Sequence, residues 1–421
     1  MIFLEFISKQ MFWILIEKIL RIFYELFVVV AIARYLGPIE FGLYSYIFSI
    51  FIIFSIFLKL GIETVLIKNI IEDKKNSFNY LYSSLFLRIS ASSIFILISY
   101  LFLNEIEFKD SIYYLIFFTA IFFQSSEVFD YYFQAFEKFK TISIIKIVQL
   151  LVSSLIKIYL IYSKASLFLF ILSFSFDYLL LFLLYIITFG IKFQFPSILF
   201  DRFFLDAKKI IKDSYPLMIS ALVVTIYMRI DQIMINYFQN TKDVGIYSAA
   251  VKIAESWYFI PMVISQFYYP KLIKNFNSSK EEFEQNLINQ FRFMSILSLL
   301  SIFFFFIFSE KTIYLLFGEE YNLSSEPLII LVMSGLFVSS GVISSKWFVI
   351  MGLQKYTMYR TFIGCLINIL LNLILIPQFS YVGAAYATLI SQSFATLFSN
   401  YFFINTKEIF FIQLRGLLFW K

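Results

Sequence analysis

The sequence predicts an all-α polytopic membrane protein, with twelve transmembrane helices in two six-helix bundles around a central cavity. Three observations lead to this fold class. Of the 421 residues, 61% are hydrophobic and only 15% are charged, whereas a soluble domain carries about 25% charged residues. Long stretches such as 296–308 and 366–376 contain no charged residue at all. Similar motifs also recur in the two halves of the chain, which indicates an internal repeat.

Twelve apolar stretches are long enough to cross a bilayer as helices. Each crossing needs about 20 mostly apolar residues. A membrane β-barrel would instead show segments of about ten residues with alternating polarity, and this sequence does not have that pattern. The predicted spans are, in order, 10–33, 41–62, 80–103, 111–134, 141–162, 166–189, 211–237, 244–268, 288–308, 327–350, 357–376 and 381–404.

Lysine and arginine concentrate in alternate loops between these spans. The loop after the sixth span, residues 190–212, holds five of them, whereas the short loop between spans eleven and twelve holds none. By the positive-inside rule, the basic loops and both termini are cytoplasmic. The net charge of +6 is therefore explained by orientation in the membrane, and no nucleic-acid partner is predicted.

Residue types that usually support catalysis or metal binding are scarce. The chain has no histidine, and its single cysteine, Cys365, lies inside a predicted span. An intramolecular disulfide is therefore excluded, and the commonest general base and metal ligand are missing. We find no P-loop or nucleophile–base pair, so no catalytic residue, bound metal or cofactor is predicted. The first apolar run contains charged residues, so no cleavable signal peptide is predicted either.

The internal repeat consists of two pairs of short motifs. The segment YLGP followed by GLYS (35–38 and 42–45) joins spans one and two, and YF followed by GIYS (237–238 and 245–248) joins spans seven and eight. AFEKF and GLQKY precede spans five and eleven. With six spans per half, the repeats have parallel topology. The sequence thus predicts bundles at 1–195 and 196–421, although chance similarity in a Phe- and Ile-rich chain is the alternative.

Span one carries four charged residues on one helical stripe. Glu17, Arg21 and Glu25 recur every four residues, and Lys18 lies three before Arg21. A charge near mid-bilayer costs roughly 2.5 to 3.5 kcal/mol on insertion scales, so such residues need a reason to be there. They form either a polar wall of the cavity or a neutralised series of ion pairs that holds the bundle together.

Span five repeats this arrangement with Lys146 and Lys157, which lie close to one face with Gln149 and Ser153. No acid shares that face, which indicates an unmatched positive stripe. A cavity position is one interpretation. The other is that each lysine extends its ammonium group to the nearest membrane surface.

Charged residues in the other spans complete the candidate site. Arg grips phosphate oxygens bidentately and Lys acts as a point charge, so a slight surplus of cations favours an anionic head-group. Acid pairs such as Glu127 and Asp130 suit either a coupling H+ or Na+ or structural pairing. The predicted substrate-binding cations are Lys18, Arg21, Lys146, Lys157, Arg229, Lys252 and Lys346. The predicted coupling or ion-pairing acids are Glu17, Glu25, Glu127, Asp130, Asp231 and Glu255.

Four motifs resemble those of a known family. They are ARYLGPIEFGLYS at 33–45, RIDQIMI at 229–235, VGIYSAA at 244–250 and YVGAAYAT at 381–388. In this order they are similar to the bacterial polysaccharide (O-antigen) flippases of the multidrug/oligosaccharidyl-lipid/polysaccharide flippase superfamily. The resemblance extends from about residue 10 to 405.

This resemblance implies a flippase of the bacterial inner membrane. Its substrate would be an undecaprenyl-pyrophosphate-linked oligosaccharide repeat unit for O-antigen, lipopolysaccharide or a similar surface polysaccharide. Alternating access would carry the unit from the cytoplasmic to the periplasmic leaflet. Membrane lipids, a coupling H+ or Na+, a polysaccharide polymerase and a chain-length regulator would be its partners.

Three other functions make different demands on the sequence. A multidrug antiporter of the same superfamily would give drug resistance and no polysaccharide defect. A membrane polysaccharide polymerase or ligase would need a large external loop and catalytic residues, and the predicted external loops are short. A structural scaffold would leave the charges in the spans unexplained. A transporter without enzymatic activity is therefore the prediction.

Overall fold

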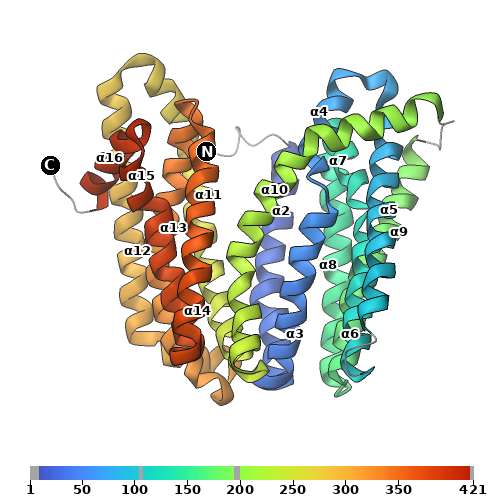
Figure 1. The fold of residues 1–421 in the computed structure, drawn as a ribbon, viewed down its shortest axis with the longest axis horizontal. Coiled ribbons are helices and arrows are strands. Elements are labelled where there is room, and N and C mark those ends of the chain that lie inside the picture. The colour runs from blue at the N-terminus through green and yellow to red at the C-terminus, as the bar shows by residue number, and fades with distance from the viewer. Residues whose placement is uncertain (1–8, 104–107, 194–199, 418–421) are drawn as a thin grey trace. The chain divides into compact units, whose positions relative to one another are not determined.

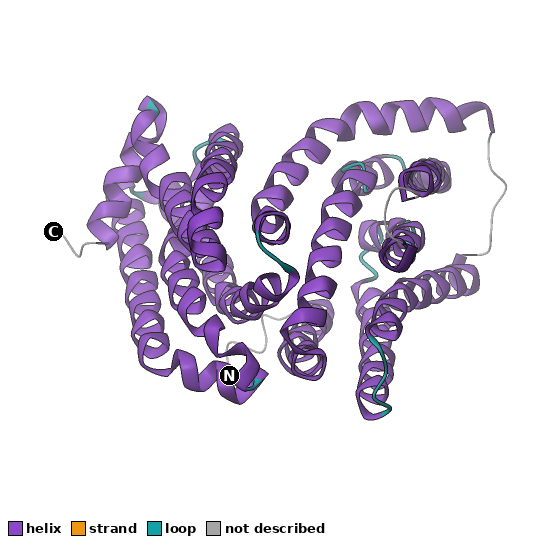
Figure 2. Cartoon of the chain, turned by 60° about the horizontal axis from the view of Figure 1, so that its bottom comes forward, coloured by secondary structure: helices purple, strands orange, loops and turns teal. Residues whose placement is uncertain are grey.

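The computed structural model describes residues 9–103, 108–193 and 200–417, and every regular element in these ranges is a helix (Figure 1). Figure 2 shows the same helices connected by short loops. The elements up to residue 193 are α2 (Lys9–Phe23), η1 (Tyr24–Val29), α3 (Val30–Leu58), α4 (Ile62–Glu72), η2 (Lys74–Asn76), α5 (Ser77–Leu103), α6 (Phe108–Gln124), α7 (Glu127–Ala135), α8 (Phe139–Tyr162) and α9 (Leu167–Phe193).

The elements that follow include the longest helices. They are α10 (Phe200–Phe238), α11 (Thr241–Ser278), α12 (Lys280–Phe317), η3 (Glu319–Ser324), α13 (Ser325–Ile350), α14 (Gln354–Ser393), η4 (Phe394–Phe398), α15 (Ser399–Phe402), η5 (Ile404–Thr406) and α16 (Lys407–Leu417). Bilayers favour such helices because all backbone hydrogen bonds are made within the segment.

The described helices accommodate the twelve predicted spans. Within the described residues, nine helical stretches are long and apolar enough to cross a membrane. Two of them, Phe12–Glu72 and Gln354–Phe402, have 61 and 49 residues, which is enough for two crossings each. The one predicted span outside these nine stretches, 244–268, lies in α11, which has 38 residues but carries more charge. The predicted all-α membrane fold is therefore confirmed.

Backbone breaks divide the two longest stretches. Gly37 in α3 has φ 70° and ψ 171°, and Pro38 follows it. Ser380 in α14 has φ 50° and ψ −134°, three residues after Pro377. Gly adopts a positive φ without steric cost, and Pro removes a helical hydrogen bond. Each break falls in a predicted loop between two spans.

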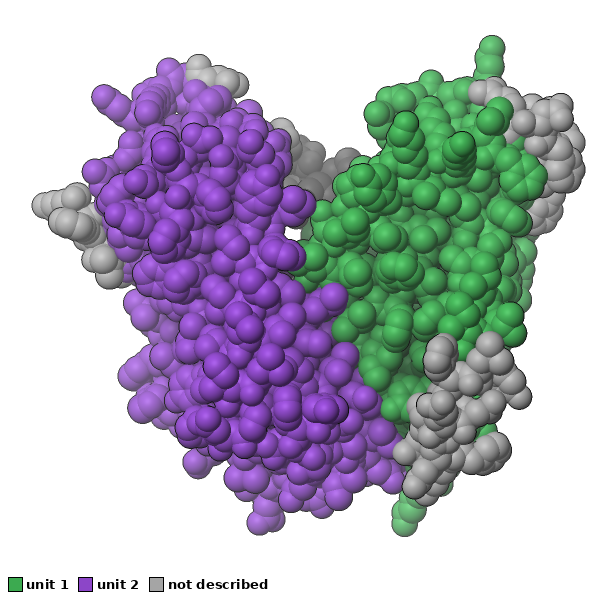
Figure 3. All heavy atoms as spheres, viewed as in Figure 1, with its two compact units in different colours: residues 1–32, 47–225 green, residues 33–46, 226–421 purple. Residues whose placement is uncertain are grey.

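The chain divides into two compact units, coloured separately in Figure 3. Unit 1 comprises residues 1–32 and 47–225, and unit 2 comprises 33–46 and 226–421. Residues 33–46 thus group with the second half of the chain, and the first part of α10 groups with the first. The predicted six-helix bundles at 1–195 and 196–421 remain a prediction about the repeat.

Each unit has its own apolar core. In unit 1, α4, α5, α7 and α9 contribute buried residues such as Leu66, Leu81, Phe133 and Phe189. In unit 2, buried side chains of α11, α12, α13 and α16 pack together, and Trp347 is 1% exposed. These cores hold the helices that carry the charged residues described next.

The repeated glycines lie at a close approach of two backbones inside unit 2. A Cβ atom on Gly42 would lie 1.7 Å from the carbonyl oxygen of Thr241, and one on Gly245 would lie 2.0 Å from that of Pro38. Glycine is needed at both positions because any side chain would overlap the opposing backbone. The repeat found in the sequence therefore marks a contact between its own two copies.

Candidate functional site

Lys157 is the centre of a buried polar cluster in unit 1. Its side chain is 2% exposed and forms an ion pair with Asp177 of α9. Its ammonium group also donates to Ser153 Oγ at 2.8 Å and to the Tyr24 hydroxyl at 2.7 Å. Tyr24 begins η1, a π-helical segment, and such segments are frequent at functional sites. The ammonium group is therefore fully enclosed by protein groups.

A second cluster joins α3, α5, α7 and α8. Glu127 pairs with Lys59 at 3.0 Å and with Arg88 at 3.3 Å, and Lys146 pairs with Asp130 at 2.5 Å. Arg88 is buried, and its Nη1 has no hydrogen-bond partner within the described ranges. The acids that pair with Lys146 and Lys157 lie on neighbouring helices. The prediction that span five carries an unmatched positive stripe is therefore wrong.

The charged stripe of the first span contains an ion pair. Arg21 donates from Nη2 to Glu17 Oε1 at 2.5 Å and from Nε at 2.9 Å. The Arg21 side chain is 48% exposed, and Lys18 is also exposed. The side chain of Glu25 lies outside the described residues. Of the two interpretations of this stripe, ion pairing therefore describes Glu17 and Arg21.

In unit 2, the predicted cations lie on three helices. Arg229 of α10 pairs with Glu255 of α11 at 3.4 Å. Lys252 lies about one helical turn before Glu255 and is half-buried. Lys346 of α13 lies over the ring of Tyr269, 5.0 Å from its centre. The structure therefore brings the predicted residues Arg229 and Glu255 together as an ion pair.

Asp231 lies in a buried cage of neutral donors from α11 and α14. Tyr247 and Thr388 each donate a hydroxyl to Oδ2 at 2.6 Å, and Asn372 donates an amide N–H to Oδ1 at 2.6 Å. Asn368 Oδ1 accepts from Asn372 at 3.1 Å. Among described residues, no cation pairs with Asp231. The hydrogen bonds described for this carboxylate therefore all come from uncharged groups.

The sequence alone did not select several residues of these clusters. Tyr247 and Thr388 lie inside family-like motifs, but nothing in their spacing indicates contact with Asp231. Arg360 was also missed: it is buried on α14 and donates to Ser344 Oγ at 2.6 Å and to the Gly341 carbonyl at 2.8 Å. Charge in an apolar span was the only available indicator for Arg88 and Asp177. The missed residues are Tyr24, Lys59, Tyr247, Arg360 and Thr388.

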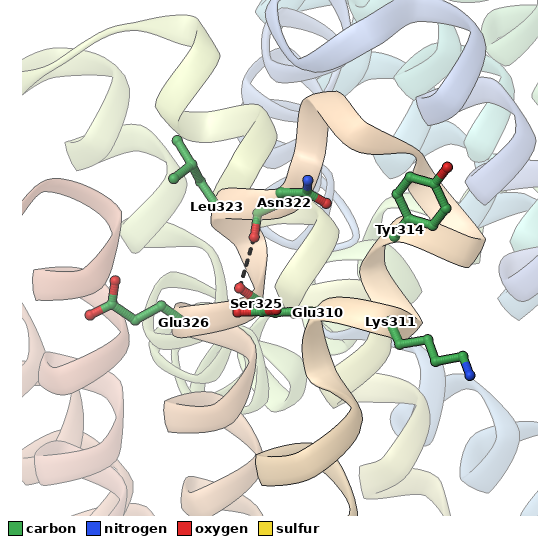
Figure 4. Close-up of a pocket in the computed structure, with 7 residues that line it drawn as sticks. All are labelled: Glu310, Lys311, Tyr314, Asn322, Leu323, Ser325 and Glu326. Atoms are coloured by element: carbon green, nitrogen blue, oxygen red, sulfur yellow. Dashed lines mark hydrogen bonds between the residues drawn. The ribbon is translucent and has the colours of Figure 1, made fainter.

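The large pocket of unit 2 lies away from these clusters. It has a volume of about 620 Å³ and lies where α12, η3 and α13 meet (Figure 4). Glu310, Lys311, Tyr314 and Glu326 are among the residues that line it. None of the predicted site residues lines it, so we place the candidate site at the charged clusters.

Comparison with known families shows to which family this chain belongs. The family described as "Polysaccharide biosynthesis protein" matches residues 7–275, and the family "MatE" matches residues 216–374. The chain belongs to the polysaccharide biosynthesis protein family. The predicted membership in the polysaccharide flippase family is thereby confirmed.

Two relatives of this polysaccharide biosynthesis family protein have names that describe glycan pathways. The "Probable low-salt glycan biosynthesis flippase Agl15" of Haloferax volcanii is 25% identical over 189 residues, which cover 45% of this chain and 40% of the relative. The "Capsular polysaccharide biosynthesis protein CapF" of Staphylococcus aureus is 30% identical over 251 residues, which cover 55% and 62%. The matched segment thus spans less than two thirds of either relative.

Solved transporters share the fold of this family protein. The lipid II flippase MurJ, in an inward closed conformation, superposes with a TM-score of 0.68 at 17% identity and covers 97% of this chain and 90% of its own. An inward-facing multidrug resistance MATE family transporter of the MOP superfamily superposes with a TM-score of 0.69 at 13% identity and covers 92% and 94%. The protein is therefore a multi-pass membrane protein with a transporter fold.

Proposed function

We propose that this protein flips a lipid-linked oligosaccharide across the membrane. Its cargo would be an undecaprenyl-pyrophosphate-linked repeat unit of O-antigen or a similar surface polysaccharide, moved from the cytoplasmic to the periplasmic leaflet. The protein would lie in the bacterial inner membrane with both termini cytoplasmic. The observation that carries the proposal is the family match over residues 7–275, which include the buried charges of unit 1 and Arg229 with its partner Glu255.

The physical task of such a flippase explains charges inside apolar helices. Sugars and phosphates cannot cross hydrocarbon unaided, because each unsatisfied polar group there costs several kcal/mol. In the proposed mechanism, two bundles rock about a polar cavity while the lipid tail stays in the bilayer. The partly exposed cations, among them Arg21 and Arg229, would bind the pyrophosphate. Lys157 is enclosed, and we propose that it mainly fixes the surrounding helices.

Removing Arg21 and Arg229 together is expected to reduce flipping about tenfold or more, because hydrogen bonds to charged groups contribute roughly 1.5–3 kcal/mol each. The measurement is transport of a lipid-linked sugar in vesicles containing the Arg21→Ala, Arg229→Ala double variant. Arg415→Ala is the matched control, since Arg415 lies on α16 and its side chain is 48% exposed. Wild-type transport by the double variant would remove both arginines from the proposal.

Asp231 is the acid that best suits ion coupling, and Asp231→Asn is expected to uncouple transport. The change keeps the size of the side chain but removes the charge that attracts H+ or Na+. Stimulation of transport by a proton or sodium gradient should fall roughly tenfold, with the rate in the absence of a gradient retained. Asp243→Asn is the control, because Asp243 lies at the start of α11 and accepts from Ser380. Undiminished stimulation in Asp231→Asn would contradict a coupling role.

A multidrug antiporter is the second candidate. The MatE match at residues 216–374 favours it, because that segment contains Asp231, whose described partners are neutral. Such a carboxylate suits a cationic drug as well as a coupling ion. Overexpression would then raise resistance to cationic compounds, and deletion would leave surface polysaccharide unchanged. The flippase proposal expects the reverse of both results.

A further inference from the structure

A small polar pocket lies between α11 and α12 within unit 2. Its volume is about 60 Å³, which is room for a few water-sized groups. Ser265 and Tyr268 of α11 and Asn286, Asn289 and Gln290 of α12 supply its polar lining. The residues that line it carry no formal charge. A phosphate or ammonium group would therefore find no counter-charge there.

Two buried polar atoms in this pocket have no partner within the described ranges. They are Gln290 Oε1 and Ser265 Oγ, on side chains that are 7% and 1% exposed. Burying an acceptor without a donor is unfavourable, so native structures rarely retain one without a reason. The other amides are partly engaged, since Asn286 donates to the Glu282 carbonyl and Asn289 accepts from Gln285. The unpartnered Gln290 Oε1 thus needs an O–H or N–H donor, and the Ser265 hydroxyl can donate or accept a further hydrogen bond.

The position of the pocket further restricts the kinds of ligand that it can bind. Asn286 and Gln290 flank the first residue of predicted span nine (288–308), at the end of the span that is predicted to be cytoplasmic. In the predicted topology, this end of the span lies at the level of the lipid head-groups. Phe293 also lines the pocket and is 49% exposed, so it offers an apolar surface beside the polar groups. Carboxamides with an adjacent aromatic ring suit the hydroxyls and the apolar face of a sugar.

We propose that this pocket binds a neutral, hydrogen-bond-donating arm of the lipid-linked sugar, namely a hydroxymethyl or acetamido group of the sugar nearest the lipid. This inference rests on the proposed function and deepens it, because it assigns recognition of the glycan to α11 and α12. The volume fits one such arm and not a whole sugar ring. The glycerol head-group of phosphatidylglycerol offers the same chemistry, and the experiment separates the two sources.

The test compares the affinities of three lipids for purified full-length protein. The lipids are undecaprenyl pyrophosphate carrying one N-acetylglucosamine, the same lipid without sugar, and phosphatidylglycerol. Wild type is expected to bind the sugar-bearing lipid roughly tenfold more tightly than the sugar-free one. Gln290→Leu and Ser265→Ala should each bring this ratio close to one, without changing the affinity for sugar-free lipid. Gln354→Leu, at an exposed position on α14, should keep the wild-type ratio.

Other outcomes overturn the proposal in distinguishable ways. A wild-type ratio retained in both pocket variants removes the sugar from this pocket and leaves the flippase proposal intact. If the pocket variants lose phosphatidylglycerol binding but keep the wild-type preference for the sugar-bearing lipid, the pocket belongs to a membrane lipid and the inference is overturned. If wild type binds neither undecaprenyl lipid, the proposed function fails and the inference fails with it. Monodisperse elution of each variant confirms that folding is unaffected.

Discussion

Lys157→Met is expected to lower the free energy of unfolding by about 3–5 kcal/mol, the usual cost of removing one partner of a buried ion pair. The change leaves Asp177 charged in a site where its side chain is only 11% exposed. It also removes the donor that holds the Tyr24 hydroxyl and Ser153 Oγ. Denaturant unfolding in mixed micelles would measure the loss.

The double variant Lys157→Met, Asp177→Leu tests the cause of this loss. Replacing a buried ion pair by apolar residues of similar size is often neutral or stabilising, so most of the lost stability should return. Lys280→Met is the control, because Lys280 pairs with Glu408 at 3.2 Å with side chains 78% and 41% exposed. It should change stability by less than about 1 kcal/mol. A single Lys157→Met variant as stable as wild type would show that the pair does not hold α8 to α9.

Gly42→Ala and Gly245→Ala are expected to prevent the close backbone contact in unit 2. The new methyl groups would lie 1.7 Å from Thr241 O and 2.0 Å from Pro38 O. Backbone atoms cannot rotate away as a side chain can, so the helices must separate. Overpacking usually costs about 1–3 kcal/mol, occasionally more, and these contacts belong to the upper end of that range.

The yield of monodisperse protein and the free energy of unfolding would measure this effect. Gly335→Ala is the matched comparison, because the nearest atoms to its new Cβ are side-chain atoms of Trp257 and Tyr258, at 3.2 Å or more. These rings can move by a few tenths of an ångström, so the loss should be smaller. Equal stability of Gly42→Ala and wild type would mean that residues 33–46 do not contact the start of α11 as described.

Much of the architecture follows from composition and periodicity. Apolar runs of about 20 residues must be helical in a bilayer, because no other single segment satisfies its own backbone. The predicted spans therefore fall within helical stretches, although several helices extend well beyond them, and the breaks at Gly37 and Ser380 lie in predicted loops. Contacts within one helix can also be anticipated from the sequence, because residues four apart share a face. The Glu17–Arg21 pair is an example.

Contacts between helices could not be predicted from the sequence in the same way. Lys157 meets Asp177 across 20 positions, and Asp231 meets Thr388 across 157. Such pairs depend on how each helix is rotated about its axis, which many side chains of several helices determine together. Lys146 and Lys157 therefore looked unmatched when their own helix was considered alone. The proposal that Lys18, Arg21, Arg229, Lys252 and Lys346 share one cavity stays a prediction.

The amino-acid sequence by itself determined the all-helical membrane fold and the family, because hydropathy and short motifs are local properties of the chain. The folded structure determined which charge neutralises which, why two repeated glycines are required, and which groups enclose Asp231. These features arise only when distant helices are packed side by side, and no local pattern encodes the rotation that brings their side chains together.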